Sequence, residues 1–446
     1  MIHPEIIKNR FRHFINSKDA DKIGIVFFRT RLQTSRFANS QIHQHLQDED
    51  QVIYFRVLID GRLGIASTNS LDENNLKTAF AKALGIARLR LETKEKKDIP
   101  LFRPLKTLPG YYHEETAKMS AAARVKALEK IFREGEALQI KFSGNFYNGL
   151  TQAVVISPEG KMDYQDYSFC GIKLIACAKD ASGYASQAAY AINALNPHAV
   201  SDIAVKKCLE GFKKITLKPG KYDVILEPDA VAEIMLWLNY IGFGAKPVFD
   251  ESSFLYNRYR KKITGANVNI YDSGSDKLTF ILPFDFEGLS RKKVYLIKNG
   301  RAGKPLCDTH YAKLLKMKNN GRANFPDDTE GPMGYNLVME GGKTDTDKMI
   351  KSAKQAILIT RFHYINGYLN THRAAMTGMT RDGTFLIEDG RIKSAVKDMR
   401  FTDSILEAFK RIKYISKERK IVADHLESLC TICAPSLYIK DFNFIS

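Results

Sequence analysis

The chain has 446 residues and a formal net charge of +18, with 44% hydrophobic and 26% charged residues. This length predicts roughly two or three domains rather than a single core. No apolar run reaches the roughly 18 residues that a membrane-spanning helix needs, and the amino terminus lacks the basic and apolar segments of a signal peptide. We therefore expect a globular cytoplasmic protein.

The positive charge is spread along the chain. Short basic runs occur, for example, at residues 258–262 and 291–293. No RNA-binding signature, in which aromatic and basic residues alternate over a longer stretch, accompanies them. The pattern favours a solvated basic surface, or an acidic partner subunit, over specific nucleic-acid binding.

Apolar spacing predicts helices and antiparallel strands in the first half of the chain. The helices are expected at residues 4–15, 72–91, 120–136 and 200–214. The strands are expected at 23–28, 34–37, 52–59, 63–67, 140–147, 152–156, 164–169 and 174–178. Asn39-Ser40 and Asp60-Gly61 should form tight turns between strands.

A change in composition at residues 217–221, Leu-Lys-Pro-Gly-Lys, predicts a domain boundary. We expect an N-terminal α/β domain over 1–217, with antiparallel strands and long helices, and a β-rich C-terminal domain over 218–446. A helix at 228–243 is apolar nearly all round, which indicates burial. Further strands are expected at 278–282, 293–297, 336–340, 356–360, 384–388 and 436–445, and a helix at 403–412. The predicted class is α+β.

Few residues form patterns typical of a metal site. Cys430 and Cys433 make one CxxC, and without a second pair this favours a buried strand over zinc binding. His43 and His45 share one face of a strand, but the neighbouring glutamines favour an exposed polar segment.

Two polar clusters are candidates for substrate binding. His363, His372 and Arg373 alternate with aromatic residues, and the two histidines could reach a common cleft across a hairpin. No third ligand lies near them, which favours substrate binding or a structural role over metal binding. Arg381 and Asp382 form the second cluster: Asp382-Gly383 is typical of a hairpin turn, and the Arg-Asp pair could order a loop beside a substrate channel.

Three segments carry a family resemblance. They are Thr-Gly-Met-Thr-Arg-Asp-Gly-Thr-Phe-Leu-Ile-Glu-Asp-Gly at 377–390, Arg-Phe-Ala-Asn-Ser-Gln-Ile-His-Gln at 36–44, and Gly-Phe-Gly-Ala at 242–245. Together they resemble the TldD/PmbA family, and the residues at the zinc-motif positions, given in the next paragraph, resemble its PmbA (TldE) branch. The resemblance implies an α/β N-terminal domain, a β-rich C-terminal domain and dimers that enclose a cavity.

Zinc peptidases of the TldD branch carry a His-Glu-x-x-x-His motif on a helix. The positions that correspond to it in this chain are Leu238, Asn239 and Phe243, and the stretch that would hold the remaining cysteine ligand falls near 421–423. Leucine and phenylalanine cannot bind zinc, and asparagine cannot accept a proton from a metal-bound water. The resemblance thus implies no catalytic residues and no metal in this chain.

The resemblance also implies a partner. A TldD-like catalytic subunit would supply zinc, and this chain would help to enclose an unfolded peptide substrate. Two alternatives stay open. One is a stand-alone homodimer that binds peptides or anions, and the other is a peptidase with a relocated site near His363 and His372.

Overall fold

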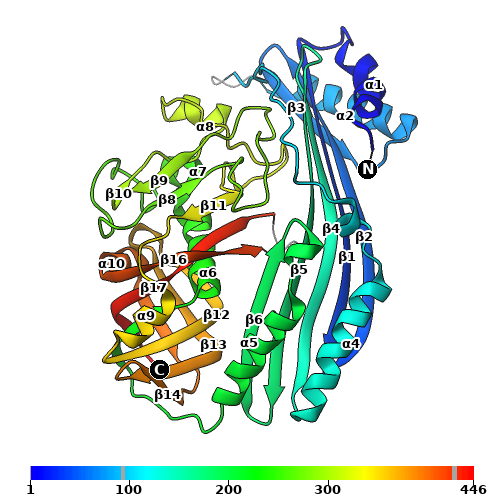
Figure 1. Cartoon of the computed structure of the whole chain (residues 1–446). Coiled ribbons are helices and arrows are strands. Elements are labelled where there is room, and N and C mark those ends of the chain that lie inside the picture. Colours follow the sequence, from blue (N-terminus) through cyan, green and yellow to red (C-terminus); the bar gives the residue numbers. More distant parts are fainter. Residues whose placement is uncertain (1, 92–95, 424–428) are drawn as a thin grey trace.

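A computed structural model describes residues 2–91, 96–423 and 429–446. It contains two large β-sheets that stand side by side, with helices packed on each (Figure 1). The predicted α+β class is confirmed. Among the residues described, no helix combines the length and apolar character needed to cross a bilayer.

The first sheet is antiparallel throughout, with strand order β3-β2-β1-β4-β5-β6. Its strands are β1 (Lys22–Ala38), β2 (Gln41–Ile59), β3 (Arg62–Thr68), β4 (Lys141–Ile156), β5 (Met162–Ala178) and β6 (Ala181–Ala189). The expected turns are confirmed, because Asn39, Ser40, Asp60 and Gly61 all adopt positive φ between paired strands. The strands are longer than predicted, since the polar stretches between the apolar runs stay paired.

Helices cover parts of this sheet at both ends (Figure 1). They are α1 (Pro4–Ile15), α2 (Glu73–Leu89), α3 (Glu114–Ala117), α4 (Ala121–Ala137), a 3-10 turn η1 (Ile192–Ala194) and α5 (Pro197–Glu210). Asp72 accepts the N–H groups of Asn74 and Asn75, so it fixes the start of α2. The helix lies very close to β3, because a Cβ on Gly64 would sit 2.0 Å from the carbonyl oxygen of Ala83.

The second sheet has eleven strands, in the order β10-β9-β8-β11-β17-β15-β13-β12-β7, with β14 beside β13 and β16 beside β17. Its strands are β7 (Gly220–Leu226), β8 (Ile270–Asp272), β9 (Val294–Lys298), β10 (Arg301–Ala302), β11 (Asn336–Met339), β12 (Gln355–Asn370), β13 (Ala375–Glu388), β14 (Arg391–Ala395), β15 (Arg400–Ser404), β16 (Ile412–Ala423) and β17 (Thr431–Phe444). The helical elements of this half are α6 (Pro228–Leu238), η2 (Asn239–Phe243), α7 (Ala245–Phe249), α8 (Thr309–Leu314), α9 (Thr346–Lys351), a 3-10 turn η3 (Thr371–Arg373) and α10 (Ile405–Lys410). β17 pairs with β7, β11, β15 and β16, so it connects most of the sheet.

The strand expected at 278–282 is wrong. These residues form a loop outside any strand, in which Phe280 is buried and stacks on Tyr167 with a ring-centroid distance of 5.8 Å. The hydroxyl of Tyr190 accepts the N–H of Ile281 at 2.7 Å. Side chains of β5 and of the residue that follows β6 therefore bury this segment and bond its main chain, although its apolar pattern is typical of a strand.

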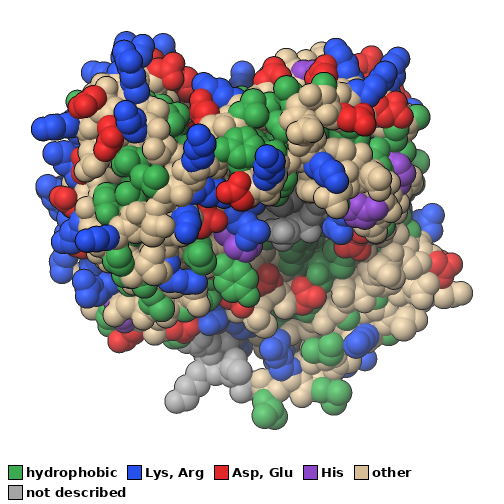
Figure 2. Space-filling model, turned by 90° about the horizontal axis from the view of Figure 1, so that it is seen from below, with side chains coloured by type: hydrophobic (Ala, Val, Ile, Leu, Met, Phe, Trp, Pro, Cys, Tyr) green, Lys and Arg blue, Asp and Glu red, His purple; other side chains and the backbone are tan. Residues whose placement is uncertain are grey.

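The two sheets meet along β6. Tyr184 in β6 lies under the guanidinium of Arg361 in β12, with 4.5 Å between the Arg Cζ and the ring centroid. Ser186, also in β6, donates a hydrogen bond from its hydroxyl to Asp229 of α6 at 2.7 Å. Figure 2 shows the molecule from below, with a hollow near the middle of this face. The domain boundary at 217/218 stays a prediction, although the strands described in the first sheet precede residue 190 and those in the second follow residue 219.

Candidate functional site

The helix expected at 228–243 consists of two parts. α6 begins at Pro228 and ends at Leu238, and residues Asn239–Phe243 form a π-helical turn, η2. Hydrogen bonds in a π turn join residues five apart, so it is wider than an α-helical turn. Leu238 and Phe243, which are five residues apart, are both completely buried in the same core cluster. The two positions that resemble zinc-ligand positions thus form part of an apolar core.

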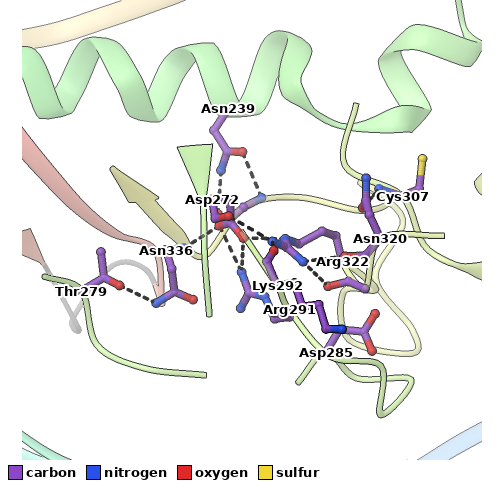
Figure 3. A network of polar contacts seen from close by, with 12 residues as sticks. Asn239, Asp272, Thr279, Asp285, Arg291, Lys292, Cys307, Asn320, Arg322 and Asn336 are labelled. Atoms are coloured by element: carbon purple, nitrogen blue, oxygen red, sulfur yellow. Dashed lines mark hydrogen bonds and ion pairs between the residues drawn. The ribbon is translucent and has the colours of Figure 1, made fainter. Parts of the chain in front are cut away.

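Asn239 stands between these two apolar positions and is 2% exposed. Its Nδ2 donates to the carbonyl oxygen of Gly334 at 2.9 Å, and its Oδ1 accepts the N–H of Gly334 at 3.0 Å (Figure 3). A Cβ on Gly334 would lie 3.0 Å from Asp272 Oδ2, so any larger residue would be tightly packed here. Both polar groups of the Asn239 amide are therefore used to hold the segment that leads into β11.

Asp272, at the end of β8, is fully buried between two guanidinium groups (Figure 3). Arg291 Nη2 donates to both of its carboxylate oxygens, at 3.1 and 3.2 Å, and Arg322 Nε lies 2.5 Å from Oδ1. The N–H of Asn336 donates to Oδ2 at 2.8 Å. Burial acts to raise the pKa of Asp272, but the two arginines and this N–H outweigh it and hold the pKa below its usual value.

These residues do not fit a zinc site. Leu238 and Phe243 offer no lone pair, Asn239 uses both polar groups on Gly334, and both oxygens of Asp272 already bind arginine. Within the described parts of the chain, no group of three or more His, Cys, Asp or Glu residues is placed to hold a metal ion.

The hairpin turn expected at Asp382-Gly383 is wrong. Both residues lie inside β13, where Ile359 pairs with Thr384 and Arg361 pairs with Arg381, so two residues of β13 oppose the single residue Thr360. This is a β-bulge, and the φ angles of 51° at Asp382 and 132° at Gly383 allow it. The same Asp-Gly chemistry that suits a turn also suits a bulge, and strand pairing on both sides selects the bulge.

The bulge directs Asp382 towards a partner that the sequence did not indicate. Arg361 Nε donates to Asp382 Oδ2 at 3.1 Å, and Arg361 Nη2 contacts the same oxygen, whereas Arg381 Nε is 3.8 Å away. His363 lies two residues beyond Arg361 on β12. Burial, followed by the charges of Arg381 and Arg361, lowers the pKa of His363 and favours its neutral form.

The structure separates the other two candidates from this cluster. His372 and Arg373 lie in η3, the turn that closes the β12–β13 hairpin, and both are exposed. Strand residues rise by about 3.3 Å each, so the length of β12 keeps His372 well away from His363. Of the predicted substrate-binding residues, His363, Arg381 and Asp382 are brought together, and His372 and Arg373 are not.

Other sequence predictions are confirmed. His43 and His45 are exposed on β2. Cys430 and Cys433 are both buried, the first just before β17 and the second within it, and burial raises the pKa of Cys430 to about 12 and that of Cys433 to about 11.

Several polar residues of the site were not predicted. They are Asp272, Arg291, Arg322, Arg361, Asp229 and Lys420. Asp229 accepts hydrogen bonds from Ser186 and from Lys420 Nζ, at 2.7 and 2.6 Å. The interaction partners of these residues lie far away in the sequence, and one signal was available: a charged residue at the end of an apolar strand, as in Ile270-Tyr271-Asp272, indicates a buried ion pair.

An aromatic patch borders η2 and β12. It consists of Trp237, Tyr240, Tyr364, Tyr368 and Leu369. The last four are 41%, 83%, 62% and 52% exposed. Trp237 contacts Tyr240 and Tyr368 with ring-centroid distances of 6.2 and 5.6 Å.

Sequence comparison defines the family. Residues 219–446 match the PmbA/TldA metallopeptidase C-terminal domain, and residues 25–87 match PmbA/TldA metallopeptidase domain 1. The chain belongs to the PmbA/TldD metallopeptidase family.

Individual relatives are distant. The metalloprotease TldD homolog of Buchnera aphidicola is 26% identical over 228 residues, which cover 50% of this chain and 44% of that protein. The zinc metalloprotease TldD homolog of Saccharolobus solfataricus is 19% identical over 387 residues, 83% of each chain. The crystal structure of TldE from Thermococcus kodakarensis is similar, with a TM-score of 0.84 at 18% identity over 99% of this chain and 100% of that one. At this identity the last likeness shows the fold.

Proposed function

We propose that this chain is the non-catalytic subunit of a cytosolic zinc metallopeptidase of TldD/TldE type. In this proposal it forms a chamber for unfolded peptides together with a zinc-bearing homologue. The observation that carries the proposal is the use of Asn239. Asn239 occupies the position that resembles the general base, and both polar groups of its amide form hydrogen bonds with the main chain of Gly334.

The chemistry supports this division of labour. Zinc-dependent hydrolysis needs a metal-bound water and a group that takes its proton. Leu238, Asn239 and Phe243 supply neither a zinc ligand nor a base. All three side chains are buried, so they are part of the packed core. The zinc and the base would come from the partner subunit.

The aromatic patch is the surface that we assign to the partner. Large exposed aromatic side chains are typical of the centre of protein interfaces. The patch adjoins η2, so a homologous subunit docked there would lie next to the degenerate motif. The cluster of His363, Arg381 and Asp382 lies on the neighbouring strands and would contact a peptide held in the chamber.

The proposal is tested by recovering the tagged chain from an extract of its native cell and identifying the bound proteins by mass spectrometry. We expect a homologue with an intact His-Glu-x-x-x-His motif in stoichiometric amount. Tyr364→Ala combined with Tyr368→Ala should reduce its recovery, whereas Phe249→Ala, which alters an aromatic residue 47% exposed on α7, should not. Recovery of a stable homodimer alone would contradict the proposal and favour a stand-alone binding protein.

The relocated-site alternative makes a different prediction. It requires about one zinc per isolated chain, lost in a His363→Ala, His372→Ala variant. We expect no stoichiometric zinc in either protein, measured by elemental analysis after dialysis against a zinc-buffered solution. Zinc bound by the wild type and lost in the variant would establish the alternative.

A further inference from the structure

A groove of about 990 Å³ lies at the β10 end of the second sheet, away from the zinc-motif positions. β9, β10, the loop at 259–260 and the loop at 318–321 form its walls. We call it the basic groove because seven cationic side chains line it. They are Arg260, Lys292, Lys293, Lys298, Arg301, Lys304 and Lys318.

The charge of the basic groove is not balanced within the chain. All seven cationic residues are exposed, and none of them forms an ion pair with a residue that the structure describes. No Asp or Glu is among its described lining residues. Elsewhere many surface cations do have a carboxylate partner, as in Lys22 with Asp98 and Lys246 with Asp250.

Like charges gathered around one concave surface repel one another and raise the local positive potential. A bound anion would relieve this repulsion at several side chains at once. The groove is large enough for a ligand that carries several negative charges, and it uses a substantial share of the net charge of +18.

The aromatic rings of the groove argue against single-stranded nucleic acid. Such ligands are held by stacking of their bases on open aromatic faces. Both tyrosines that line the groove already carry a cation over the ring: Lys298 Nζ lies 4.8 Å from the Tyr295 centroid, and Arg260 Cζ lies 5.3 Å from that of Tyr259. Lys293 Nζ is also near the Tyr295 ring, at 5.4 Å.

Main-chain groups that line the groove already form hydrogen bonds with one another. Arg260 N donates to the carbonyl of Ala302 at 2.8 Å, and Ala302 N donates to the carbonyl of Lys261 at 2.9 Å. β10 therefore offers a ligand no free edge for strand pairing at these groups, and side-chain charge is the feature left for recognition. Five of the seven cations are lysines, whose compact charge on a flexible stem can follow carboxylates at varied positions along a peptide.

We propose that the basic groove binds an acidic peptide segment, in which several Asp or Glu side chains face the lysines. This surface involves neither zinc nor a partner subunit, so the inference does not depend on the proposed function. It assigns the chain a second binding surface that selects its ligand by charge.

The test uses the full chain and fluorescence anisotropy. The probe is a labelled peptide of ten glutamates, compared with a peptide of ten glutamines and with single-stranded oligo-dT of ten nucleotides. We expect binding of the glutamate peptide that weakens steeply with added salt, because the contacts are exposed ion pairs. We expect no measurable binding of the glutamine peptide. Equal binding of the two peptides, or tighter binding of oligo-dT, would overturn the proposal.

A charge-reversal variant locates the site. Lys298→Glu, Lys304→Glu and Lys318→Glu together should weaken glutamate-peptide binding by about tenfold or more, since three ion pairs are lost and the new carboxylates repel the ligand. The matched control is Lys8→Glu, Lys126→Glu and Lys130→Glu, exposed lysines on α1 and α4 with the same total change of charge. The control should bind within about twofold of wild type. If both variants lose binding equally, net charge rather than the groove is responsible and the proposal fails. A Lys→Gln version of the groove variant should also bind weakly, which covers the case in which charge reversal prevents folding.

Discussion

Two regions of the molecule each bury a carboxylate completely, with opposite results. Asp272, in the second sheet, has two arginines beside it and a pKa held below the usual value. Asp163, in β5 of the first sheet, accepts one N–H, from Leu105 at 2.6 Å, and its Oδ2 has no hydrogen-bond partner in the described structure. Burial raises the pKa of Asp163 to about 6. Burial therefore makes a charge costly, and the neighbouring groups determine whether the acid keeps it.

The largest change in the free energy of unfolding is expected at Asp272, whose charge is compensated by two arginines. Asp272→Asn leaves Arg291 and Arg322 buried without a counter-charge, and it should lower the free energy of unfolding by about 3–5 kcal/mol. Urea unfolding followed by the fluorescence of Trp237, the single tryptophan, measures it. Asp347→Asn, at an exposed acid on α9, should change it by less than about 0.5 kcal/mol. A loss below about 1 kcal/mol for Asp272→Asn would mean that the arginines do not depend on this carboxylate.

A neutral polar group in the same region should matter somewhat less. Asn239→Leu leaves the N–H and C=O of Gly334 unpaired and buried, and we expect a loss of about 2–3 kcal/mol in the same unfolding experiment. The neighbouring Leu238→Met keeps the volume and should cost under about 1.5 kcal/mol. Equal effects of the two substitutions would indicate that packing, rather than the hydrogen bonds to Gly334, sets the stability of η2.

Removing the charge of Asp163, which has no cation beside it, should raise the free energy of unfolding rather than lower it. Because the pKa of Asp163 in the folded protein lies above its ordinary value, folding favours the protonated form. The stability from this preference is present below a pH of about 4 and is lost as the pH rises through about 6. Asp163→Asn keeps the acceptor for Leu105 and should stabilise the protein by about 1–2 kcal/mol at pH 8, with little effect at pH 4. Urea unfolding at both pH values measures this difference, and a variant that is less stable at pH 8 would refute the interpretation.

Asp229 is a third buried acid, with one lysine beside it rather than two arginines or none. The smallest change in the free energy of unfolding is expected at this position. Burial acts to raise its pKa, and Lys420 together with Ser186 outweighs this and lowers it. Ser186→Ala removes the hydrogen bond that Ser186 donates to Asp229 and the one that it accepts from Lys420, and the free energy of unfolding should fall by about 1 kcal/mol. Ser275→Ala, at an exposed position, is the control. No change in Ser186→Ala would show that Lys420 alone holds the carboxylate.

Local rules predicted much of the fold. The helix expected at 72–91, the turns at Asn39-Ser40 and Asp60-Gly61, and the burial of α6 follow from residues close in sequence. The interpretations that were wrong depend on distant residues. Asp382-Gly383 is a bulge because strands on both sides are paired, and residues 278–282 are a loop because Tyr190 and Tyr167 bury them.

The candidate site was predicted in part for the same reason. The chemistry of Leu238, Asn239 and Phe243 is readable from their side chains, and the family resemblance located them. The ion-pair partners of Asp272 and Asp382 were not predicted from the sequence, because Arg291, Arg322 and Arg361 lie about 20 to 50 positions away in the chain. A sequence pattern indicates that a buried acid needs a cation, but only the fold determines which one.

The position of β17 has a consequence for the biosynthesis of the protein. β7 starts at residue 220, but one of its two neighbours in the sheet, β17, ends at residue 444. At about 5–20 residues translated per second, β7 waits roughly 10–45 s for that neighbour, and the later strands wait for shorter times, while the first sheet is already complete in the nascent chain. During this interval unpaired strand edges of the second half are exposed to solvent and to other chains. We expect this half of the molecule to depend most on chaperones and to be the first to aggregate when its synthesis is interrupted.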